Sequence, residues 1–315
     1  MDISNVCILG GSGFVGRALA DQLSPLGVRV RIVTRRAPRA MAETVLPTVE
    51  VMEADPHDAA QLPGCFDNMD AVINLVGILH ETRRQTFQAC HAELPRKVVQ
   101  ACHSAGVRQL LHMSALGAAD NAPSAYLRSK AAGEAAVRQG AGILPFTIFR
   151  PSVVFGEGDA FLNTFAGLVR LFPVVPLAGA GARFQPIWVD DVARCFVGAL
   201  GNARAFGQTF ELAGPKVYTL RELVELVART LGLKRRVVPL PGPLATLQAT
   251  LLEHLPGRLM TRDNLASMSV DNVAAGPFPE LFGFQPSSLE AIVPDYLAAS
   301  LSRARYAGYR YIAGR

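Results

Sequence analysis

The sequence contains no apolar run that approaches the roughly 20 residues a helix needs to cross a bilayer. It also lacks low-complexity tracts and internal repeats, which excludes repeat architectures and long disordered segments. Charged residues are few, at 18% against 50% hydrophobic residues, a balance typical of an ordered globular protein. At 315 residues the chain can bury a large core, and we expect one domain with a smaller second lobe.

Cysteine pairs are missing as well. The five cysteines form no CxxC motif and are odd in number, which indicates reduced thiols in a reducing compartment. The Cys-His pairs at positions 90–91 and 102–103 resemble metal ligands, but about 12 residues of helix would separate them by about 18 Å. We therefore expect no metal site. Because the chain begins directly with the apolar strand Val6–Leu9, we also expect no signal peptide, and a protein that is cytoplasmic or peripheral to the inner face of the membrane.

The net charge of +5 and the pI of about 9.1 reflect a moderate basic excess, part of which lies between Arg303 and Arg315 among tyrosines. This segment suits an acidic partner, phospholipid head groups or RNA, or it packs its tyrosines on the body of the protein. We predict no nucleic-acid partner. The apolar helical stretch Leu244–Leu255 is either buried, a lid over the substrate, or a contact with lipid or another subunit.

Hydrophobic strands alternate with helical patterns through the first half of the chain. This alternation predicts an α/β fold, a doubly wound parallel (Rossmann) sheet with helices on both faces. After Arg150-Pro151 the alternation loosens. We predict a nucleotide-binding domain over 1–155, to which 183–214 returns, and a smaller C-terminal substrate or partner lobe over 156–315. The predicted strands are 6–9, 29–34, 48–53, 71–76, 109–113 and 146–150, with helices at 14–23, 87–105 and 288–301.

A glycine-rich turn follows the first strand. Gly10, Gly13 and Gly16 occupy its first, fourth and seventh positions, and Phe14 and Val15 begin the next helix. Glycines let the backbone approach a pyrophosphate, which then binds to the free N–H groups of that helix. A tight turn without a ligand is the alternative, but strand before and helix after favour a dinucleotide site.

The end of the second strand identifies the dinucleotide. An NAD site places an acidic residue about 20 residues after the glycine turn to accept from the ribose 2′-OH. Here Arg35 and Arg36 stand instead, and paired guanidiniums suit a 2′-phosphate. We therefore predict NADP(H), with NAD as the weaker possibility and a solvated arginine pair as the ligand-free alternative. Asp55 ends the third apolar run, where a carboxylate can reach the adenine amino group.

Three side chains after the fifth strand suit proton transfer. Tyr126 and Lys130 are four residues apart and share one helix face, and Ser114 ends the preceding strand. A neighbouring ammonium favours the phenolate, and the serine hydroxyl can hold a substrate oxygen near the tyrosine. A surface pair without function is the alternative. We predict a Tyr-Lys-Ser proton relay.

Together these motifs resemble the short-chain dehydrogenase/reductase superfamily in its extended form, related to the NAD-dependent epimerases and dehydratases. Asn74-Leu75-Val76-Gly77 and Trp188-Val189-Asp190-Asp191-Val192 add to the resemblance. Within it, Ser114-Ala115-Leu116-Gly117 and Leu259-Met260-Thr261-Arg262 resemble the atypical group of the dehydrogenase-like accessory subunit of mitochondrial complex I. The resemblance implies NADP(H), and a tie to complex I or ubiquinone biosynthesis. It implies cofactor contacts from Leu75, Val76, Gly77, Lys130, Arg150, Pro151 and Val153.

One position departs from the pattern of that superfamily. Extended members carry an asparagine that organises a water of the proton relay, and His91 falls in this place. The departure bears on catalysis and not on cofactor binding.

Three functions fit the sequence. The first is an NADP(H)-dependent oxidoreductase acting on a lipophilic, quinone-related small molecule. The second is a nucleotide-sugar epimerase or dehydratase, for which Arg183 and Arg258 offer diphosphate ligands. The third is a non-catalytic cofactor-binding module that assembles with a respiratory complex at the membrane. The sequence identifies neither the substrate nor the oligomeric state.

Overall fold

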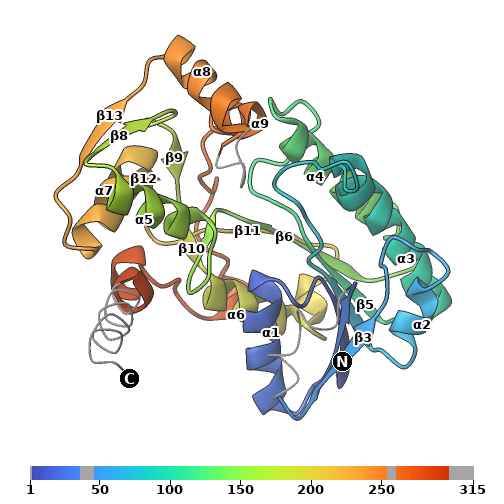
Figure 1. Ribbon diagram of the computed structural model, residues 1–315. Coiled ribbons are helices and arrows are strands. Elements are labelled where there is room, and N and C mark those ends of the chain that lie inside the picture. Colours follow the sequence, from blue (N-terminus) through green and yellow to red (C-terminus); the bar gives the residue numbers. More distant parts are fainter. Residues whose placement is uncertain (1, 36–45, 254–259, 298–315) are drawn as a thin grey trace, which may run out of the picture. The chain divides into compact units, whose positions relative to one another are not determined.

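The computed structural model describes residues 2–35, 46–253 and 260–297 (Figure 1). Within the described residues, no helix is both long and apolar enough to cross a membrane. The chain divides into two compact units. Unit 1 comprises Met1–Pro151, Val189–Leu212 and Ala274–Phe284, and unit 2 comprises Ser152–Trp188, Ala213–Val273 and Gln285–Arg315. Of the segment 183–214 that was predicted to return, Val189–Leu212 belongs to unit 1, whereas 183–188 and 213–214 belong to unit 2. The second return, at 274–284, has no counterpart in the sequence prediction.

Unit 1 is built on a seven-stranded parallel sheet with the order β11-β6-β5-β4-β1-β2-β3. The chain runs outward from β1 in both directions, so the strand order reverses between β1 and β4. In doubly wound sheets a ligand binds at this point, outside the carboxyl ends of the strands. The strands are β1 (Asn5–Leu9), β2 (Arg29–Thr34), β3 (Val49–Glu53), β4 (Ala71–Asn74), β5 (Gln109–Met113), β6 (Phe146–Pro151) and β11 (Thr209–Leu212).

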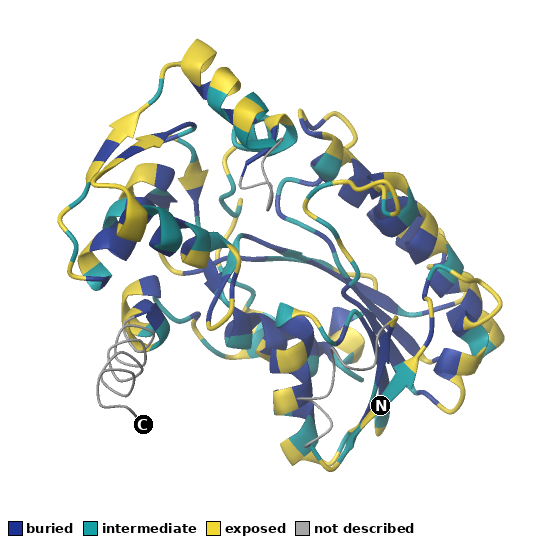
Figure 2. Ribbon diagram, viewed as in Figure 1, coloured by how far each residue is buried: buried dark blue, intermediate teal, exposed yellow. Residues whose placement is uncertain are grey.

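Helices cover both faces of this sheet, as the hydrophobic strands require. Helices α2, α3 and α4 lie along one face, and α1 packs against α6 along the other (Figure 1). The central strands β1, β4, β5 and β6 are almost wholly buried, whereas the edge strands β3 and β11 are partly exposed (Figure 2). The doubly wound parallel fold predicted from the sequence is confirmed. The helices are α1 (Phe14–Leu23), α2 (Leu62–Phe66), α3 (Leu94–Ser104), α4 (Ala125–Arg138) and α6 (Val189–Ala199).

Two elements of unit 1 differ from the expected boundaries. Strand β4 ends at Asn74, not at 76, because the Asn74 side chain accepts a hydrogen bond from the Val76 N–H (3.2 Å) and turns the chain. The helix expected over 87–105 is not uniform: Gln88–Glu93 is π-helical, and α3 begins only at Leu94. Such wide turns are frequent at functional sites.

A buried ion pair ties α4 to the sheet. Glu134 of α4 is fully buried, and its two carboxylate oxygens accept from the guanidinium of Arg150 on β6, both at 2.7 Å. Arg138 adds a second contact at 2.9 Å. Burial raises the pKa of Glu134, but the hydrogen bonds from Arg150 and Ser114 and the charges of Arg150 and Arg138 together outweigh it and lower that pKa. Breaking such a pair costs about 3–5 kcal/mol, because it leaves a buried charge without its partner.

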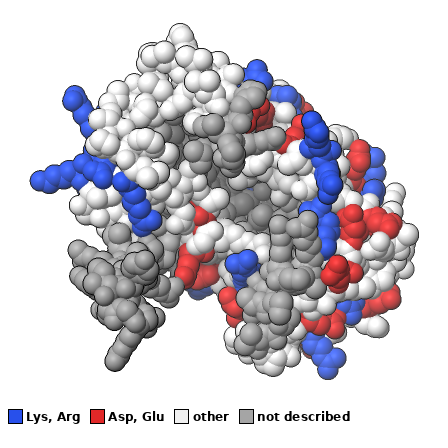
Figure 3. Space-filling view, viewed as in Figure 1, with Lys and Arg blue, Asp and Glu red and all other residues white. Residues whose placement is uncertain are grey.

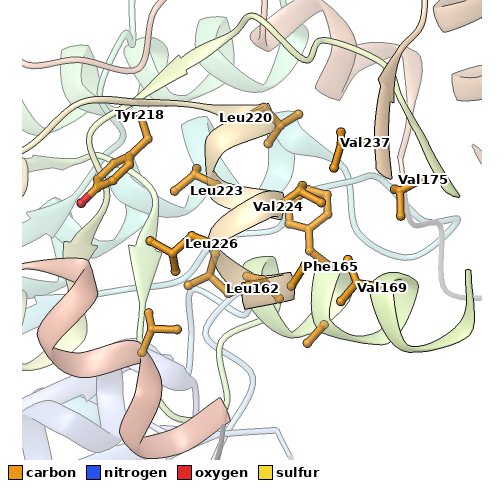
Figure 4. Packing of buried hydrophobic residues seen from close by; sticks show 14 of the residues in the cluster. Leu162, Phe165, Val169, Val175, Tyr218, Leu220, Leu223, Val224, Leu226 and Val237 are labelled. Atoms are coloured by element: carbon orange, nitrogen blue, oxygen red, sulfur yellow. The ribbon is translucent and has the colours of Figure 1, made fainter. Parts of the chain in front are cut away.

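Unit 2 is smaller and mixed. Its core lies between helices α5 and α7, with β8 and β13 beside them (Figure 4). Leu162, Phe165 and Val169 of α5 face Leu223 and Val224 of α7 in this core. The elements are β7 (Val154–Phe155), α5 (Phe161–Leu171), β8 (Val174–Leu177), β9 (Arg183–Phe184), β10 (Ile187–Trp188), β12 (Tyr218–Thr219), α7 (Leu220–Thr230), β13 (Arg236–Pro239), α8 (Gly242–Glu253) and α9 (Arg262–Ser267), with a further helix over 289–297.

Helix α8 of unit 2 is more exposed than an apolar helix usually is. Only Ala245 and Ala249 of this helix are buried. Leu244, Leu247 and Leu251 are 50%, 54% and 62% exposed. Figure 2 shows the helix largely in yellow, and Figure 3 shows its surface as mostly uncharged. The expectation that this stretch is buried is therefore wrong for its leucine face.

Candidate functional site

The glycine turn of unit 1 has the geometry of an anion cradle. Gly10 has a φ of +79°, and a Cβ there would lie 3.2 Å from the Val76 nitrogen, so only glycine fits without strain. A Cβ on Gly16 would overlap the carbonyl of Gly11, so the first turn of α1 packs directly on the loop. Gly13 is the N-cap of α1 and supplies no side-chain cap. The first N–H groups of the helix are thus left for an external anion.

A cavity of about 810 Å³ opens in front of this turn, within unit 1. It lies at the switch point of the sheet, because it is lined by the loops that follow β1, β2 and β4. The lining residues are Gly10, Ser12, Gly13, Val33, Thr34, Arg35, Pro56, His57, Leu75, Val76, Gly77, Ile78, Thr82, Arg83, Arg84 and Gln85. The chemistry of this lining suits a dinucleotide with its pyrophosphate at the start of α1.

The structure brings together most of the predicted cofactor residues. Gly10, Gly13 and Arg35 line the cavity, as do the residues of 75–77, while Phe14, Val15 and Gly16 form the start of α1 behind the turn. Asp55 is not among the lining residues; its carboxylate accepts from the His57 N–H at 3.0 Å. Arg36 lies outside the described residues.

Three further cofactor predictions fall elsewhere. Arg150 has its guanidinium bound to Glu134, so in this structure it holds α4 on the sheet. Pro151 ends β6 beside it. Val153 belongs to unit 2.

Sequence reasoning missed several residues that line the cavity, namely Thr82 to Gln85, Ser12, Thr34 and His57. The available signal was the Arg83-Arg84 pair soon after the fourth strand, a second basic pair in a predicted nucleotide-binding domain. It was overlooked because only the end of the second strand has a known ribose-reading role.

The three predicted catalytic residues converge where β5 meets α4. Ser114 follows β5, Tyr126 lies in the first turn of α4, and Lys130 lies one turn later. The Lys130 ammonium is 3% exposed and donates to the Met113 carbonyl at 2.7 Å. The hydroxyl of Ser114 lies beside the Glu134 carboxylate and helps to lower its pKa. The Lys130 ammonium and the Ser114 hydroxyl therefore both contact other protein groups in the core.

The pKa values of this cluster differ from the expectation that the ammonium favours a phenolate. Burial raises the pKa of Tyr126 to about 12, so the neutral phenol predominates at pH 7. Burial also lowers the pKa of Lys130 to about 8, although the nearby Glu134 opposes this shift. Desolvation outweighs charge attraction at both groups. A neutral phenol is a proton donor, which suits reduction of a carbonyl.

His91, which stands in the place of the superfamily's asparagine, is buried on the π-helical segment. Its Nε2 accepts from the Ile78 N–H at 3.0 Å, so its proton is on Nδ1, which donates to Ser129 Oγ at 2.8 Å. Ser129 in turn donates to the Tyr126 carbonyl at 2.6 Å. Burial, together with Lys130, lowers the pKa of His91 to about 3, so it is neutral. This chain of hydrogen bonds connects the loop after β4 with the start of α4.

Metal ligands do not gather anywhere in the described ranges: no group of three or more His, Cys, Asp or Glu side chains could hold an ion there. The five cysteines are buried free thiols.

Comparison with known proteins adds the family context. The model of the NAD dependent epimerase/dehydratase family matches residues 6–213. The chain is similar to the mitochondrial NADH dehydrogenase [ubiquinone] 1 alpha subcomplex subunit 9 of Rattus norvegicus, at 33% identity over 90% of this chain and 77% of that protein. The Arabidopsis thaliana protein of that name is 35% identical over 77% of this chain but only 61% of its own length.

A relative with another name is the ceramide reductase of Caulobacter vibrioides, 31% identical over 76% of this chain and 74% of that protein. Among solved structures, the UDP-glucose 4-epimerase of Thermotoga maritima has a TM-score of 0.72 at 18% identity, covering 94% of this chain and 99% of its own. At this identity the likeness shows the fold alone.

Lys130 yields a testable consequence of its burial. Below pH 8 the folded protein carries the cost of a buried ammonium, about 3 kcal/mol for the lowering of its pKa from 10.5 to about 8. Between pH 8 and 10.5 the unfolded chain binds more protons than the folded one, so this cost disappears as pH rises. We expect Lys130→Met to be more stable than the wild type at pH 7, with the difference shrinking toward pH 10.5, measured by chemical denaturation.

Lys216→Met, which removes a lysine side chain that is 62% exposed, controls for loss of one charge. A stability difference between wild type and Lys130→Met that does not change with pH would contradict a depressed pKa at this lysine.

Proposed function

From the premise that the chain belongs to the NAD-dependent epimerase/dehydratase family, within the extended short-chain dehydrogenase/reductase superfamily, we propose that it is an NADP(H)-dependent oxidoreductase. The observation that carries the proposal is the cavity at the switch point of the sheet, which combines the uncapped start of α1 with Arg35 at the end of β2. The helix start suits a pyrophosphate, and the guanidinium suits a ribose 2′-phosphate.

The proposed chemistry divides between cofactor and chain. NADPH, when bound, supplies the hydride. Tyr126, neutral at pH 7, donates its phenolic proton to the developing alkoxide of the substrate. Lys130, held by the Met113 carbonyl, stabilises the phenolate that remains. The negative charge of the buried Glu134 in turn stabilises the Lys130 ammonium. His91 and Ser129 hold the first turn of α4 so that Tyr126 stays in place.

We propose a lipophilic, quinone-related or lipid substrate. Supporting this choice are the apolar composition of unit 2 and the name of one relative, ceramide reductase, which denotes reduction of a lipid. The nucleotide-sugar alternative has less support, because Arg183, one of its two candidate diphosphate ligands, is ion-paired with Asp271 at 3.2 Å. The other, Arg258, lies outside the described residues.

The cofactor choice predicts that the protein binds NADPH more tightly than NADH. A 2′-phosphate adds charge-assisted hydrogen bonds with guanidinium groups, each worth about 1.5–3 kcal/mol, so we expect a preference of tenfold or more. Isothermal titration calorimetry with both nucleotides measures it. Equal affinities, or tighter binding of NADH, would reject NADP(H) as the cofactor.

The catalytic role predicts that Tyr126→Phe removes most turnover and leaves the NADPH Kd unchanged. General acid catalysis contributes about 10²–10⁴-fold, and the hydroxyl is the only group lost. The assay follows NADPH absorbance and product formation with a water-soluble quinone and with a long-chain 3-keto lipid. Tyr218→Phe, which removes a phenol bound to Glu290 in unit 2, is the matched control. A loss below tenfold in Tyr126→Phe would assign the proton to another group.

Docking at a membrane is a second candidate function, and the exposed leucine face of α8 favours it. In this alternative the protein binds its cofactor without turnover and assembles with a respiratory complex, as the names of its complex I relatives suggest. The basic segment Arg303–Arg315, predicted from the sequence to join α8 in such a contact, lies outside the described residues.

For this candidate we expect the protein to float with anionic liposomes, and Leu247→Gln/Leu251→Gln to weaken that binding tenfold or more. Each leucine contributes about 1.5–3 kcal/mol when it leaves water. Leu26→Gln/Ile143→Gln, which removes two equally exposed apolar side chains from unit 1, is the control. Absence of flotation at low salt, or equal losses in both double variants, would refute a lipid contact through α8.

A further inference from the structure

The loop between β4 and the π-helical segment carries a turn that is fixed by its own hydrogen bonds. Thr82 and Gln85 exchange backbone hydrogen bonds of 2.8 and 3.3 Å. The Thr82 hydroxyl also accepts from the Arg84 and Gln85 N–H groups at 3.4 and 3.1 Å. One residue before the turn, Glu81 accepts from the Phe87 N–H at 2.7 Å and so anchors the loop to the next helix. Arg83 and Arg84 therefore stand at the tip of a defined turn.

This turn lines the same cavity as the end of β2, and the two are in contact. The side-chain amide of Gln85, with its oxygen directed at Arg35, accepts from both terminal nitrogens of that guanidinium, at 2.9 and 3.2 Å. Arg83 and Arg84 precede Gln85 directly and line the cavity together with Arg35. Three arginines thus line the same cavity as the glycine turn that suits the pyrophosphate.

The charge of these arginines is not neutralised within the part of the chain that the structure describes: none of the three is ion-paired with a carboxylate there. Ser12, Thr34 and Thr82 add hydroxyl groups to the lining of the cavity. Guanidiniums held near one another repel, so a dianion placed between them gains both hydrogen bonds and relief of that repulsion. Hydroxyl donors add further ligands for phosphate oxygens.

We propose that the turn Thr82–Gln85 forms the second half of a 2′-phosphate site, in which Arg83 and Arg84 bind, across from Arg35, the phosphate that distinguishes NADPH from NADH. The inference rests on the proposed function, since it assumes that a dinucleotide occupies the cavity. Gln85 has a positioning role in it, because its amide oxygen orients Arg35 without contacting the phosphate.

The test is calorimetric titration of NADPH, NADH and 2′,5′-ADP into the wild type, Arg35→Gln, Arg83→Gln/Arg84→Gln and a control. The control, Arg96→Gln/Arg229→Gln, removes two exposed arginines that do not line the cavity. We expect Arg83→Gln/Arg84→Gln to weaken NADPH and 2′,5′-ADP tenfold or more and to leave NADH within twofold. Thermal melting of each variant checks the fold, and single substitutions replace the double variant if it does not fold.

Gln85→Leu separates positioning from mere proximity: we expect a smaller loss of NADPH affinity, with NADH again unchanged. Equal weakening of NADPH and NADH in Arg83→Gln/Arg84→Gln would place the arginines at the pyrophosphate and overturn the inference. Unchanged NADPH affinity in that variant, with a loss in Arg35→Gln, would overturn it while the proposed cofactor stands. A wild type without preference for NADPH would instead reject the proposed cofactor itself.

Discussion

The cluster of Ser114, Tyr126 and Lys130 depends on one close approach between two helical segments. A Cβ on Gly133 of α4 would overlap the carbonyl oxygen of His91, so the π-helical segment and α4 meet backbone to backbone. Only glycine at 133 permits this distance, and the His91 carbonyl that it meets lies in the widened turn over 88–93. The approach places the His91 ring against Tyr126, with ring centroids 5.5 Å apart, and close enough to Lys130 to share its electrostatic field. The position of the Tyr126 phenol thus depends on the backbone contact between Gly133 and His91.

Burial then determines the charges of that cluster. Lys130 and Glu134 lie one turn apart on α4 and are both almost inaccessible to water, yet their pKa values shift unequally. Glu134 is satisfied by Arg150 and Arg138, so its carboxylate stays charged, whereas Lys130 has a backbone carbonyl as its hydrogen-bond acceptor and loses part of its preference for the proton. A fold selected for stability alone would have an apolar side chain at 130. The retained ammonium fits a functional role, since strain and buried charge concentrate at sites that perform chemistry.

The sequence predicted the features whose cause is local. Parallel strands covered on both faces are largely hydrophobic, so six strands of unit 1 were visible as apolar runs, whereas the edge strand β11 (Thr209–Leu212) was missed. The turn at Gly10 was visible because no other residue fits there. Features caused by distant contacts were missed. The π-helical turn packs against Gly133, which is distant in the sequence. Arg150 is held by Glu134, which lies on another element. Residues 274–284 return to unit 1 through the tertiary fold. The exposure of Leu247 depends on which neighbours α8 has, which helical periodicity alone does not specify.

The three functions considered for this chain require different features of unit 1 and unit 2. All three need the cavity of unit 1, because even an assembly module would bind its cofactor there, so that cavity cannot distinguish them. Tyr126 and Lys130 separate turnover from mere binding, since a purely structural cofactor needs neither a neutral phenol nor a buried ammonium. The surface of unit 2 separates a small-molecule enzyme from one that works at a lipid surface. Helix α8 packs on unit 2 through Ala245 and Ala249, so its half-exposed leucines are the part of the helix whose apolar surface a partner or a bilayer would remove from water.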